Sequence, residues 1–105
     1  MNTTKYEVIL RSEEVRKRVR CVTHKGKVVS FVVQLEYNNG QGWRQVVRFD
    51  NAHGFVHRDR YFANGPAEKH YFIAEQDLGK ALDRANAEIN EQWETWLAEY
   101  REGER

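Results

Sequence analysis

The stretch VRKRVRCVTHKGKVVSFVVQLEYNNGQGWRQVVRFD, residues 15–50, decides the fold of this chain. Apolar β-branched and aromatic residues alternate in it with polar ones, which is the pattern of strands buried on one face. Two turn signals, HKG and NNGQG, divide the stretch into runs over residues 15–23, 27–37 and 43–50. Short glycine-containing turns join antiparallel neighbours, so the stretch predicts an antiparallel meander.

The register of these runs follows from the requirement that each face of the sheet keeps one character. A two-residue turn within NNGQG would mix apolar and polar side chains, because a slip of one residue turns a whole strand over. We therefore expect a loop of odd length, which places Phe31 opposite Phe49. By the same argument, a three-residue loop with Gly26 in a left-handed conformation places Val19 opposite Phe31. One face of the sheet is then apolar, and Trp43 belongs to it.

The opposite face of the predicted sheet is open and basic. Alternate positions of the first and third runs carry Arg16, Arg18, Arg20 and Arg48. An antiparallel sheet commonly keeps one side in water, so this face is either an ordinary solvated surface or a surface that holds the phosphates of an RNA. The aromatic residues that could stack on bases are expected in the core instead: Trp43, Phe49, Trp93 and Trp96.

The chain changes character near residue 73. Beyond it, apolar residues recur at steps of three and four, as on one face of an amphipathic helix: Leu78, Leu82, Ala85, Ile89, Trp93, Trp96 and Tyr100. Asp77 is one candidate N-cap, and Ala74 or Glu75 are alternative first residues of the helix. Gly103 is expected to end it.

The fold class is therefore α+β. We expect an antiparallel β-meander of three to five strands over residues 5–72, with one long C-terminal amphipathic helix over residues 74–103 packed on one face. Residues 6–10 are a candidate strand at the sheet edge, with residues 12–14 as its turn. The length of 105 residues and the hydrophobic content of 40% fit a single domain, residues 1–105.

Composition and charge narrow the environment of the protein. Its apolar runs are shorter than the roughly 20 residues that span a bilayer, and its first residues lack the apolar core of a signal peptide. The single Cys21 cannot form an internal disulfide. We expect a cytoplasmic protein without a membrane partner and without a cofactor. Residues 1–70 carry 13 Lys and Arg against 7 Asp and Glu, whereas residues 71–105 carry 4 against 9, which fits a basic surface for an anionic partner and a separate acidic helix.

The segment RFDNAHGFVHRDRYFANGPAEKHYF, residues 48–72, holds three of the four histidines and is the candidate site. Asp50, Asn51 and Gly54 directly follow a predicted strand and favour a sharp structural turn. The remainder is expected to be one long connection, closed by a short last strand or extended run, whose side chains converge. Connections of this length without regular structure are usually functional or disordered, and the aromatic residues here favour order.

Three chemical interpretations of this segment compete. In the first, one histidine is the general base and another histidine or a tyrosine is the general acid in cleavage of an RNA phosphodiester, while arginines neutralise the phosphate. The candidate catalytic residues are His53, His57, Arg58 and His70. The candidate substrate-binding residues are Arg16, Arg18, Arg20, Arg48, Arg60 and Lys69.

In the second interpretation, a divalent metal ion is held by N and O ligands from Asp50, His53, His57 and Asp59. The spacing is irregular and matches no compact metal motif, so we assign no metal site. In the third, the carboxylates pair with neighbouring arginines and the histidines are ordinary loop residues. The residue types alone leave these interpretations open.

A Phe-Asp-Asn turn, a His-Arg pair, a glycine, and a glutamate followed by aromatic residues precede the helix in that order. The residues concerned are Phe49, Asp50, Asn51, Gly54, His57, Arg58, Gly65, Glu68, Tyr71 and Phe72. This order resembles the TumE family of small toxin components of bacterial and archaeal toxin–antitoxin systems. The chain departs from that family at Asp59, where a second histidine is usual, and at Lys69 and His70, where an acidic residue and a proline are common.

The resemblance implies a toxin that acts on RNA or on the translation machinery and is neutralised by a small antitoxin, often a helix-turn-helix protein. It favours His57 and Arg58 as the pair that performs chemistry or contacts phosphate. The alternative is a non-enzymatic interaction or nucleic-acid-binding module with a basic sheet face. In that alternative, the aromatic end of the helix mediates a homodimer through Trp93, Trp96 and Tyr100.

Overall fold

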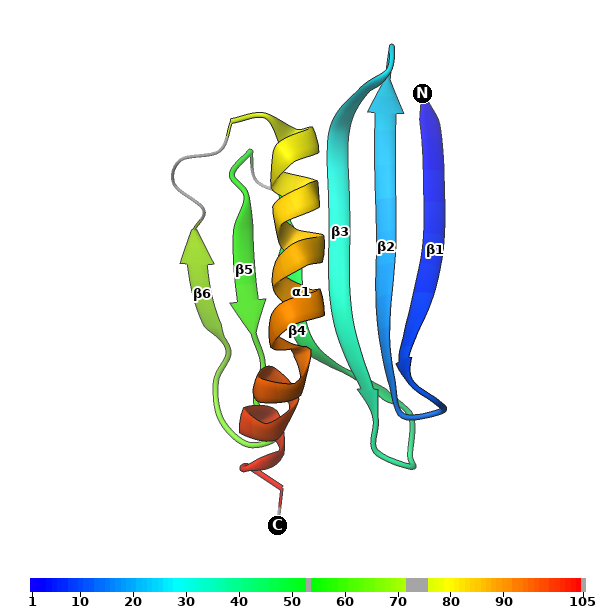
Figure 1. Ribbon diagram of the computed structural model, residues 1–105. Coiled ribbons are helices and arrows are strands. Elements are labelled where there is room, and N and C mark those ends of the chain that lie inside the picture. The colour runs from blue at the N-terminus through cyan, green and yellow to red at the C-terminus, as the bar shows by residue number, and fades with distance from the viewer. Residues whose placement is uncertain (53, 72–75, 105) are drawn as a thin grey trace.

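The computed structural model describes residues 1–52, 54–71 and 76–104 and shows an α+β fold (Figure 1). In these residues, six strands and one helix follow one another along the chain. They are β1 (Asn2–Arg11), β2 (Val15–His24), β3 (Lys27–Asn38), β4 (Trp43–Asp50), β5 (His57–Arg60), β6 (Glu68–Tyr71) and α1 (Leu78–Arg101). Each strand pairs antiparallel with the next, so the order in the sheet is the order in the chain. The fold class is confirmed, and the expected three to five strands are an undercount.

The strands outside the central β2, β3 and β4 lie at both edges of the sheet. β1 contains the candidate strand at residues 6–10 and pairs with β2 through a tight turn at residues 12–14. β5 forms within the segment that was expected to be one long connection, whereas β6 lies where a short last strand or extended run was expected. The four residues of β5, His-Arg-Asp-Arg, include no apolar side chain, so the hydrophobic pattern that identifies strands is missing there.

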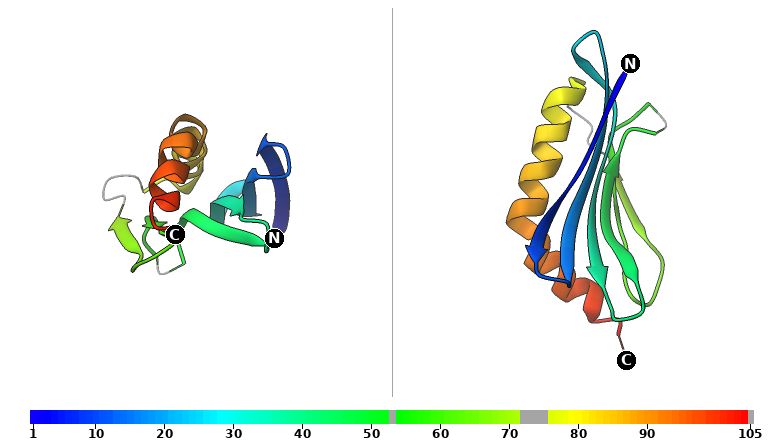
Figure 2. Two further views of the ribbon diagram at one scale, coloured as in Figure 1. Left: turned by 90° about the horizontal axis from the view of Figure 1, so that it is seen from below. Right: turned by 90° about the vertical axis from the view of Figure 1, so that its right-hand side faces the viewer.

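The helix covers one face of the sheet. α1 runs along β3 and β4, with its contacts concentrated on β3, and Figure 2 shows it on one side of the curved sheet. Phe31, Leu35 and Phe49 are fully buried beneath it, where they meet a stripe of helix residues. That stripe consists of Ala81, Ala85, Ile89, Trp96, Leu97 and Tyr100. Each large buried side chain contributes about 1.5–3 kcal/mol, so this layer accounts for the core that the amphipathic pattern predicted.

The register between β2 and β3 differs from the expected one. The turn has two residues, Lys25 and Gly26, both with positive φ angles of 51° and 78°. Such turns follow the natural twist of the strands, and the irregularity between Val22 and Thr23 then shifts the register. As a result, Val19 lies opposite Val33 and not opposite Phe31. The shift is an even number of residues, so the division into an apolar and a basic face stands.

The register between β3 and β4 also contains an irregularity, between Leu35 and Glu36. Phe49 lies opposite Val33 and not opposite Phe31, and Trp43 lies opposite Asn38. The prediction that Trp43 is a core residue is therefore wrong, because the shift turns its side chain to the face without the helix. There the guanidinium of Arg16 stacks 3.8 Å from the centre of the indole ring.

Both ends of α1 are defined by specific contacts. The side chain of Asp77 accepts a hydrogen bond of 3.1 Å from the backbone N–H of Lys80, so Asp77 is the N-cap and the helix is shorter than residues 74–103. The alternative first residues at 74 and 75 lie outside the described residues. At the other end, Gly103 lies two residues beyond the helix, and its Cα packs against the backbone of Asn64. The described residues include no helix with the length and apolar character that a bilayer crossing requires.

The aromatic stripe proposed as a dimer surface lies mostly inside the chain. Trp96 and Tyr100 are buried, with Trp96 against Phe49 and Tyr100 edge-on to Tyr37. Trp93 is partly buried and lies under the guanidinium of Arg11. These rings therefore complete the core of the chain, and a homodimer formed through them stays a prediction with little exposed aromatic area to support it.

Candidate nucleic-acid interface

The face of the sheet opposite α1, called here the helix-free face, gathers charged residues from all parts of the sheet. Strand pairing sets them in rows that cross the strands. One row is Lys5, Arg20, Val32, Asp50 and His57. The next row is Glu7, Arg18, Gln34, Arg48, Asp59 and Lys69. Neighbouring members of a row lie about 4.8 Å apart along the sheet, so these side chains form one continuous surface.

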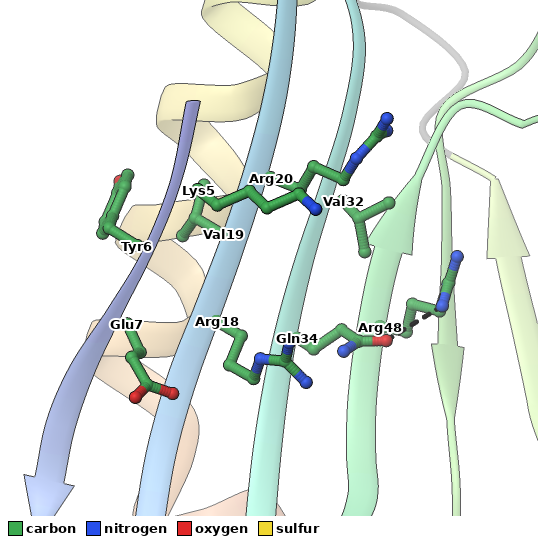
Figure 3. Close-up of a pocket in the computed structure, with 9 residues that line it drawn as sticks. All are labelled: Lys5, Tyr6, Glu7, Arg18, Val19, Arg20, Val32, Gln34 and Arg48. Atoms are coloured by element: carbon green, nitrogen blue, oxygen red, sulfur yellow. Dashed lines mark hydrogen bonds between the residues drawn. The ribbon is translucent and has the colours of Figure 1, made fainter. Parts of the chain in front are cut away.

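Part of this face is hollowed. A shallow hollow of about 600 Å³ lies over β1 to β4, and Figure 3 shows it from the side opposite α1. Among its lining residues, Lys5, Arg18, Arg20 and Arg48 are basic, whereas Glu7 is acidic. Val32 lies on the floor between the arginines. The hollow is thus an open and predominantly positive depression.

The basic residues of this face divide by how firmly they are paired. Arg16 donates to Glu36 at 2.7 Å, lies 3.4 Å from Glu7 and stacks on Trp43, so it is fixed in place. Arg18 has only a long contact of 3.6 Å with Glu36, and its side chain is 52% exposed. Lys5 and Arg20 are exposed, and within the described part of the chain neither has a carboxylate oxygen within 4.0 Å. Arg18, Arg20 and Lys5 are therefore the cations most available to an external anion.

A buried ion-pair cluster borders the hollow. His57, only 3% exposed, lies with Nε2 at 3.2 Å from Oδ1 of Asp50 and 3.6 Å from Oδ2 of Asp59. The Nε–H of Arg48 donates to Oδ2 of Asp50 at 2.7 Å, and Lys69 Nζ lies 3.9 Å from Asp59. We call these five residues the His57 cluster. It joins β4, β5 and β6 on the helix-free face.

The electrostatics of the His57 cluster favour the ionised form of Asp50 by lowering its pKa. Burial alone would raise the pKa of Asp50. The hydrogen bonds from the Ala52 backbone N–H and from Arg48, with the charges of His57 and Arg48, outweigh burial and hold the pKa of Asp50 below its usual value. Asp50 is thus a stable anion that anchors the cluster.

The cluster also has the composition of a metal site, and its fit can be tested against its neighbours. Asp50, His57 and Asp59 each offer a ligand atom, and these atoms lie within 4.8 Å of one another. Arg48 and Lys69 already lie against these carboxylates, at Oδ2 of Asp50 and Oδ1 of Asp59, the oxygens that do not face His57. A divalent ion there would add two positive charges beside two cations. The cluster is therefore better described as an ion-pair network. It shares with the third interpretation the pair of Asp50 and Arg48, but Asp59 pairs with Lys69, and His57 lies in β5 and not in a loop.

His57 and Arg58, the pair favoured by the resemblance, point to opposite faces of the sheet because they are consecutive in β5. The guanidinium of Arg58 lies over the ring of Trp96, 5.4 Å from its centre, and 3.8 Å from Glu88 of α1. Arg60 likewise pairs with Glu99 of α1. Both arginines hold the helix to the sheet, so they do not join His57 at one phosphate.

The other candidate catalytic histidine of the described residues, His70, does not lie beside His57 either. His70 lies opposite Arg58 in the strand pairing, so it faces the side of α1, where it is half exposed and 3.8 Å from Glu68. His53 lies outside the described residues. His57 itself has its second ring nitrogen 3.3 Å from the carbonyl oxygen of Phe55. Among the described residues, no second histidine lies beside His57, so the histidine pair of the first interpretation is not assembled.

The turn after β4 is built by side-chain hydrogen bonds. Oδ1 of Asp50 accepts from the backbone N–H of Ala52 at 3.0 Å, and Oδ1 of Asn51 accepts from the N–H of Phe31 at 3.0 Å. Gly54, with a φ of +81°, donates its N–H to the carbonyl oxygen of Asn51. Asn51 therefore ties the turn to β3, in the structural role expected for this triplet.

The sequence analysis missed the part of the surface that β1 supplies. Lys5 and Glu7 line the hollow, and Gln34 accepts a hydrogen bond from Arg48 there. A signal for the first two was present in residues 5–9, where Lys and Glu alternate with apolar residues as in a half-buried strand. The expected edge strand carried these charges, but its register with β2 was needed to place them beside Arg18 and Arg20.

Comparison with known proteins places the chain in one family. The model of the family described as "Domain of unknown function (DUF7718)" matches residues 1–105, and the chain belongs to that family. No curated protein and no solved structure matches the chain. The family description names no activity, so the function has to be argued from the geometry of the helix-free face.

Proposed function

We propose that the protein binds RNA through the helix-free face of its sheet and that this binding needs no catalysis by the protein. The observation that carries the proposal is the group of cations around the hollow: Arg18, Arg20 and Lys5 are exposed there with little or no internal pairing. Exposed arginines that do not form ion pairs within the protein are groups that bind phosphates.

The shape of the surface favours an extended polyanion over a small ligand. The row from Arg18 in β2 to Lys69 in β6 crosses four strand spacings, or about 19 Å at 4.8 Å each. A shallow, open hollow does not enclose a metabolite, whereas a nucleic-acid backbone can lie across such a row. The charges along it alternate with Gln34 and Asp59, so contacts would be made at separated phosphates.

The proposed binding reads the backbone more than the bases. Tyr6 is the aromatic residue among those lining the hollow, and its position opposite Val19 directs it to the other side of the sheet. Trp43 lies on the helix-free face, but Arg16 covers its ring. Since no uncovered aromatic ring is among the described residues that line the hollow on this face, sequence preference is expected to be weak and dependence on salt strong.

The test is fluorescence anisotropy with a labelled single-stranded RNA of about 20 nucleotides, at several salt concentrations. Removal of one phosphate contact should weaken binding and reduce the slope of log K against log[salt] by about 0.7 for a single strand. We expect this for Arg18→Ala and for Arg20→Ala. Lys80→Ala removes an exposed cation from α1, on the other layer, and should change neither quantity. Equal effects of all three variants, or no binding by the wild type, would refute the proposal.

We also propose, from the resemblance to TumE-like toxins alone, that RNA binding by this face arrests growth and that a small antitoxin protein relieves the arrest. Expression of the wild-type chain in a bacterial host should then slow growth, and the double variant Arg18→Ala, Arg20→Ala should not. Circular dichroism would confirm that both are folded. Fragmented RNA would point to cleavage, intact RNA to binding alone, and normal growth with a folded wild-type protein would end the toxin hypothesis.

A further inference from the structure

The free edge of the sheet is a long and exposed strand. β1 pairs with β2 on one side, and it is the first strand in the order of the described sheet, so its other backbone edge has no partner there. Tyr6, Val8 and Ile9 of this strand are 46%, 38% and 59% exposed. Soluble proteins usually shorten, cover or charge such an edge, because it can pair with another chain. β1 has ten residues and two charged side chains in its middle, Lys5 and Glu7.

The positions of these two charges make the edge complementary to itself. In an antiparallel pair of two β1 strands centred on Tyr6, Lys5 lies opposite Glu7 of the second copy, and Glu7 lies opposite Lys5 of the second copy. Opposite charges directly across antiparallel strands are favourable, and like charges are unfavourable. Centring the pair on Lys5 or on Glu7 would instead set two like charges against each other.

The other side chains fit the same register. Tyr6 meets Tyr6 of the second copy, and Thr4 meets Val8 of the second copy. These side chains lie on the side of the sheet that carries α1, because Tyr6 and Val8 lie opposite Val19 and Lys17 of β2. Lys5, Glu7 and Ile9 lie on the helix-free face, opposite Arg20, Arg18 and Arg16. An axis through Tyr6 keeps these faces aligned, so both helices cover the same side of the joined sheet.

The charges are also available for this contact. In the described part of the chain, Lys5 has no ion pair, whereas Glu7 has a single one, at 3.4 Å to Arg16. A register centred on Ile9 would pair Glu7 with Arg11. Arg11 already pairs with Glu14, however, and its guanidinium covers Trp93. The pairing of β1 with β2 is also irregular between Ile9 and Arg11. The register centred on Tyr6 uses residues 2–10 of each copy.

We propose that two copies of this chain associate through their β1 edges, antiparallel and centred on Tyr6, to form one continuous sheet. The two helix-free faces then adjoin, and so do their hollows, because Lys5, Tyr6 and Glu7 line each hollow. This interface differs from the aromatic end of α1 considered from the sequence. It also stands whether or not the face binds RNA.

Light scattering during size-exclusion chromatography over a range of concentrations tests the interface by charge exchange. The wild type should be a dimer. Lys5→Glu sets two pairs of glutamates against each other, and Glu7→Lys two pairs of lysines, so each should weaken dimerisation about tenfold or more. The double variant Lys5→Glu, Glu7→Lys restores the opposite pairs and should restore the dimer. Lys80→Glu on α1 serves as the charge control and should behave as the wild type.

Each alternative gives a different pattern. A wild type that stays monomeric at every concentration contradicts the proposal, and so does a dimer that the double variant fails to recover. A dimer that Glu7→Lys breaks and Lys5→Glu leaves intact would indicate the register centred on Ile9. A dimer that neither single variant weakens would place the interface elsewhere. Circular dichroism of each variant shows that the fold itself is unchanged, which the exposed positions of both residues lead us to expect.

Discussion

His57 is a buried histidine that lies between two carboxylates. In the sequence it stands beside Arg58 and Asp59, a setting that fits a general base, because histidine titrates near neutrality. In the structure its Nε2 faces Asp50 and Asp59, its Nδ1 lies near the carbonyl oxygen of Phe55, and the side chain is almost fully buried. A substrate cannot reach either nitrogen without opening the cluster. We therefore assign His57 to the stability of β4, β5 and β6.

The first prediction follows from this assignment. His57→Ala leaves Asp50 and Asp59 facing each other without their shared partner, and removal of one member of a buried ionic group typically costs about 3 kcal/mol. Urea unfolding should show a loss of that order in the free energy of unfolding. His70→Ala is the matched control, because that ring is half exposed on the next strand, and it should cost little. A loss of RNA binding by His57→Ala at unchanged stability would contradict a structural role.

The second prediction concerns pH. The folded pKa of Asp50 lies below the unfolded value of about 3.9, so between the two the unfolded chain binds more protons than the folded chain. The stability supplied by Asp50 is therefore present above about pH 4 and is lost as the pH falls through the folded pKa. Unfolding free energies measured at a series of pH values should fall more steeply for the wild type than for Asp50→Asn. Parallel curves for the two proteins would show that Asp50 does not provide this pH-dependent part of the free energy of unfolding.

At the scale of elements, the alternation in residues 15–50 determined the faces but not the register. Val19, Phe31 and Phe49 point to the core as expected. The two predicted pairings, of Val19 with Phe31 and of Phe31 with Phe49, are each wrong by an even number of residues. Burial selects the face, and any even shift satisfies it equally. The exact partners depend on the two-residue turn at Lys25 and on bulges, which no periodic pattern reveals.

Two other elements show what local sequence can and cannot decide. The step of three and four in residues 78–100 predicted α1 well, because its buried stripe is long and regular. Lys17 of β2 lies on the same face as Val15 and Val19, where it is 5% exposed and donates to Asn90 of α1 at 2.9 Å. That contact joins residues 73 positions apart in the chain, so only the tertiary structure identifies it. The arginines of β5 could not be assigned to α1 for the same reason.

The third prediction belongs to the end of α1. A Cβ added at Gly103 would lie 2.7 Å from the backbone N of Asn64, so Gly103→Ala must push the helix end away from the loop between β5 and β6. Such overpacking typically costs about 1–3 kcal/mol. Thermal unfolding should therefore occur at a lower temperature for Gly103→Ala, whereas Glu102→Ala, at the exposed neighbouring position, should unfold close to the wild type. Equal unfolding temperatures for Gly103→Ala and the wild type would mean that this contact is loose.

At the scale of the whole molecule, a net charge of +1 conceals two surfaces of different character. Acidic residues concentrate on α1, where Glu88 and Glu99 pair with arginines of β5, and unpaired cations concentrate on the helix-free face near Arg18 and Arg20. One face of the sheet therefore completes the core, and the other is the face that we propose binds RNA. The charge asymmetry along the sequence indicated this separation, although it could not identify Lys5 as part of the surface.

The measurement that tests the central claim most directly is methyl and amide NMR of the labelled protein during titration with single-stranded RNA. Val32 and Val33 are consecutive in β3 and face opposite sides of the sheet, Val32 in the hollow and Val33 in the core. We predict that the methyl signals of Val32 and the amide signals of Arg18 and Arg20 shift with added RNA, while Val33 and α1 change little. Shifts confined to α1, or no shifts at any RNA concentration, would contradict the assignment of the helix-free face as the functional surface.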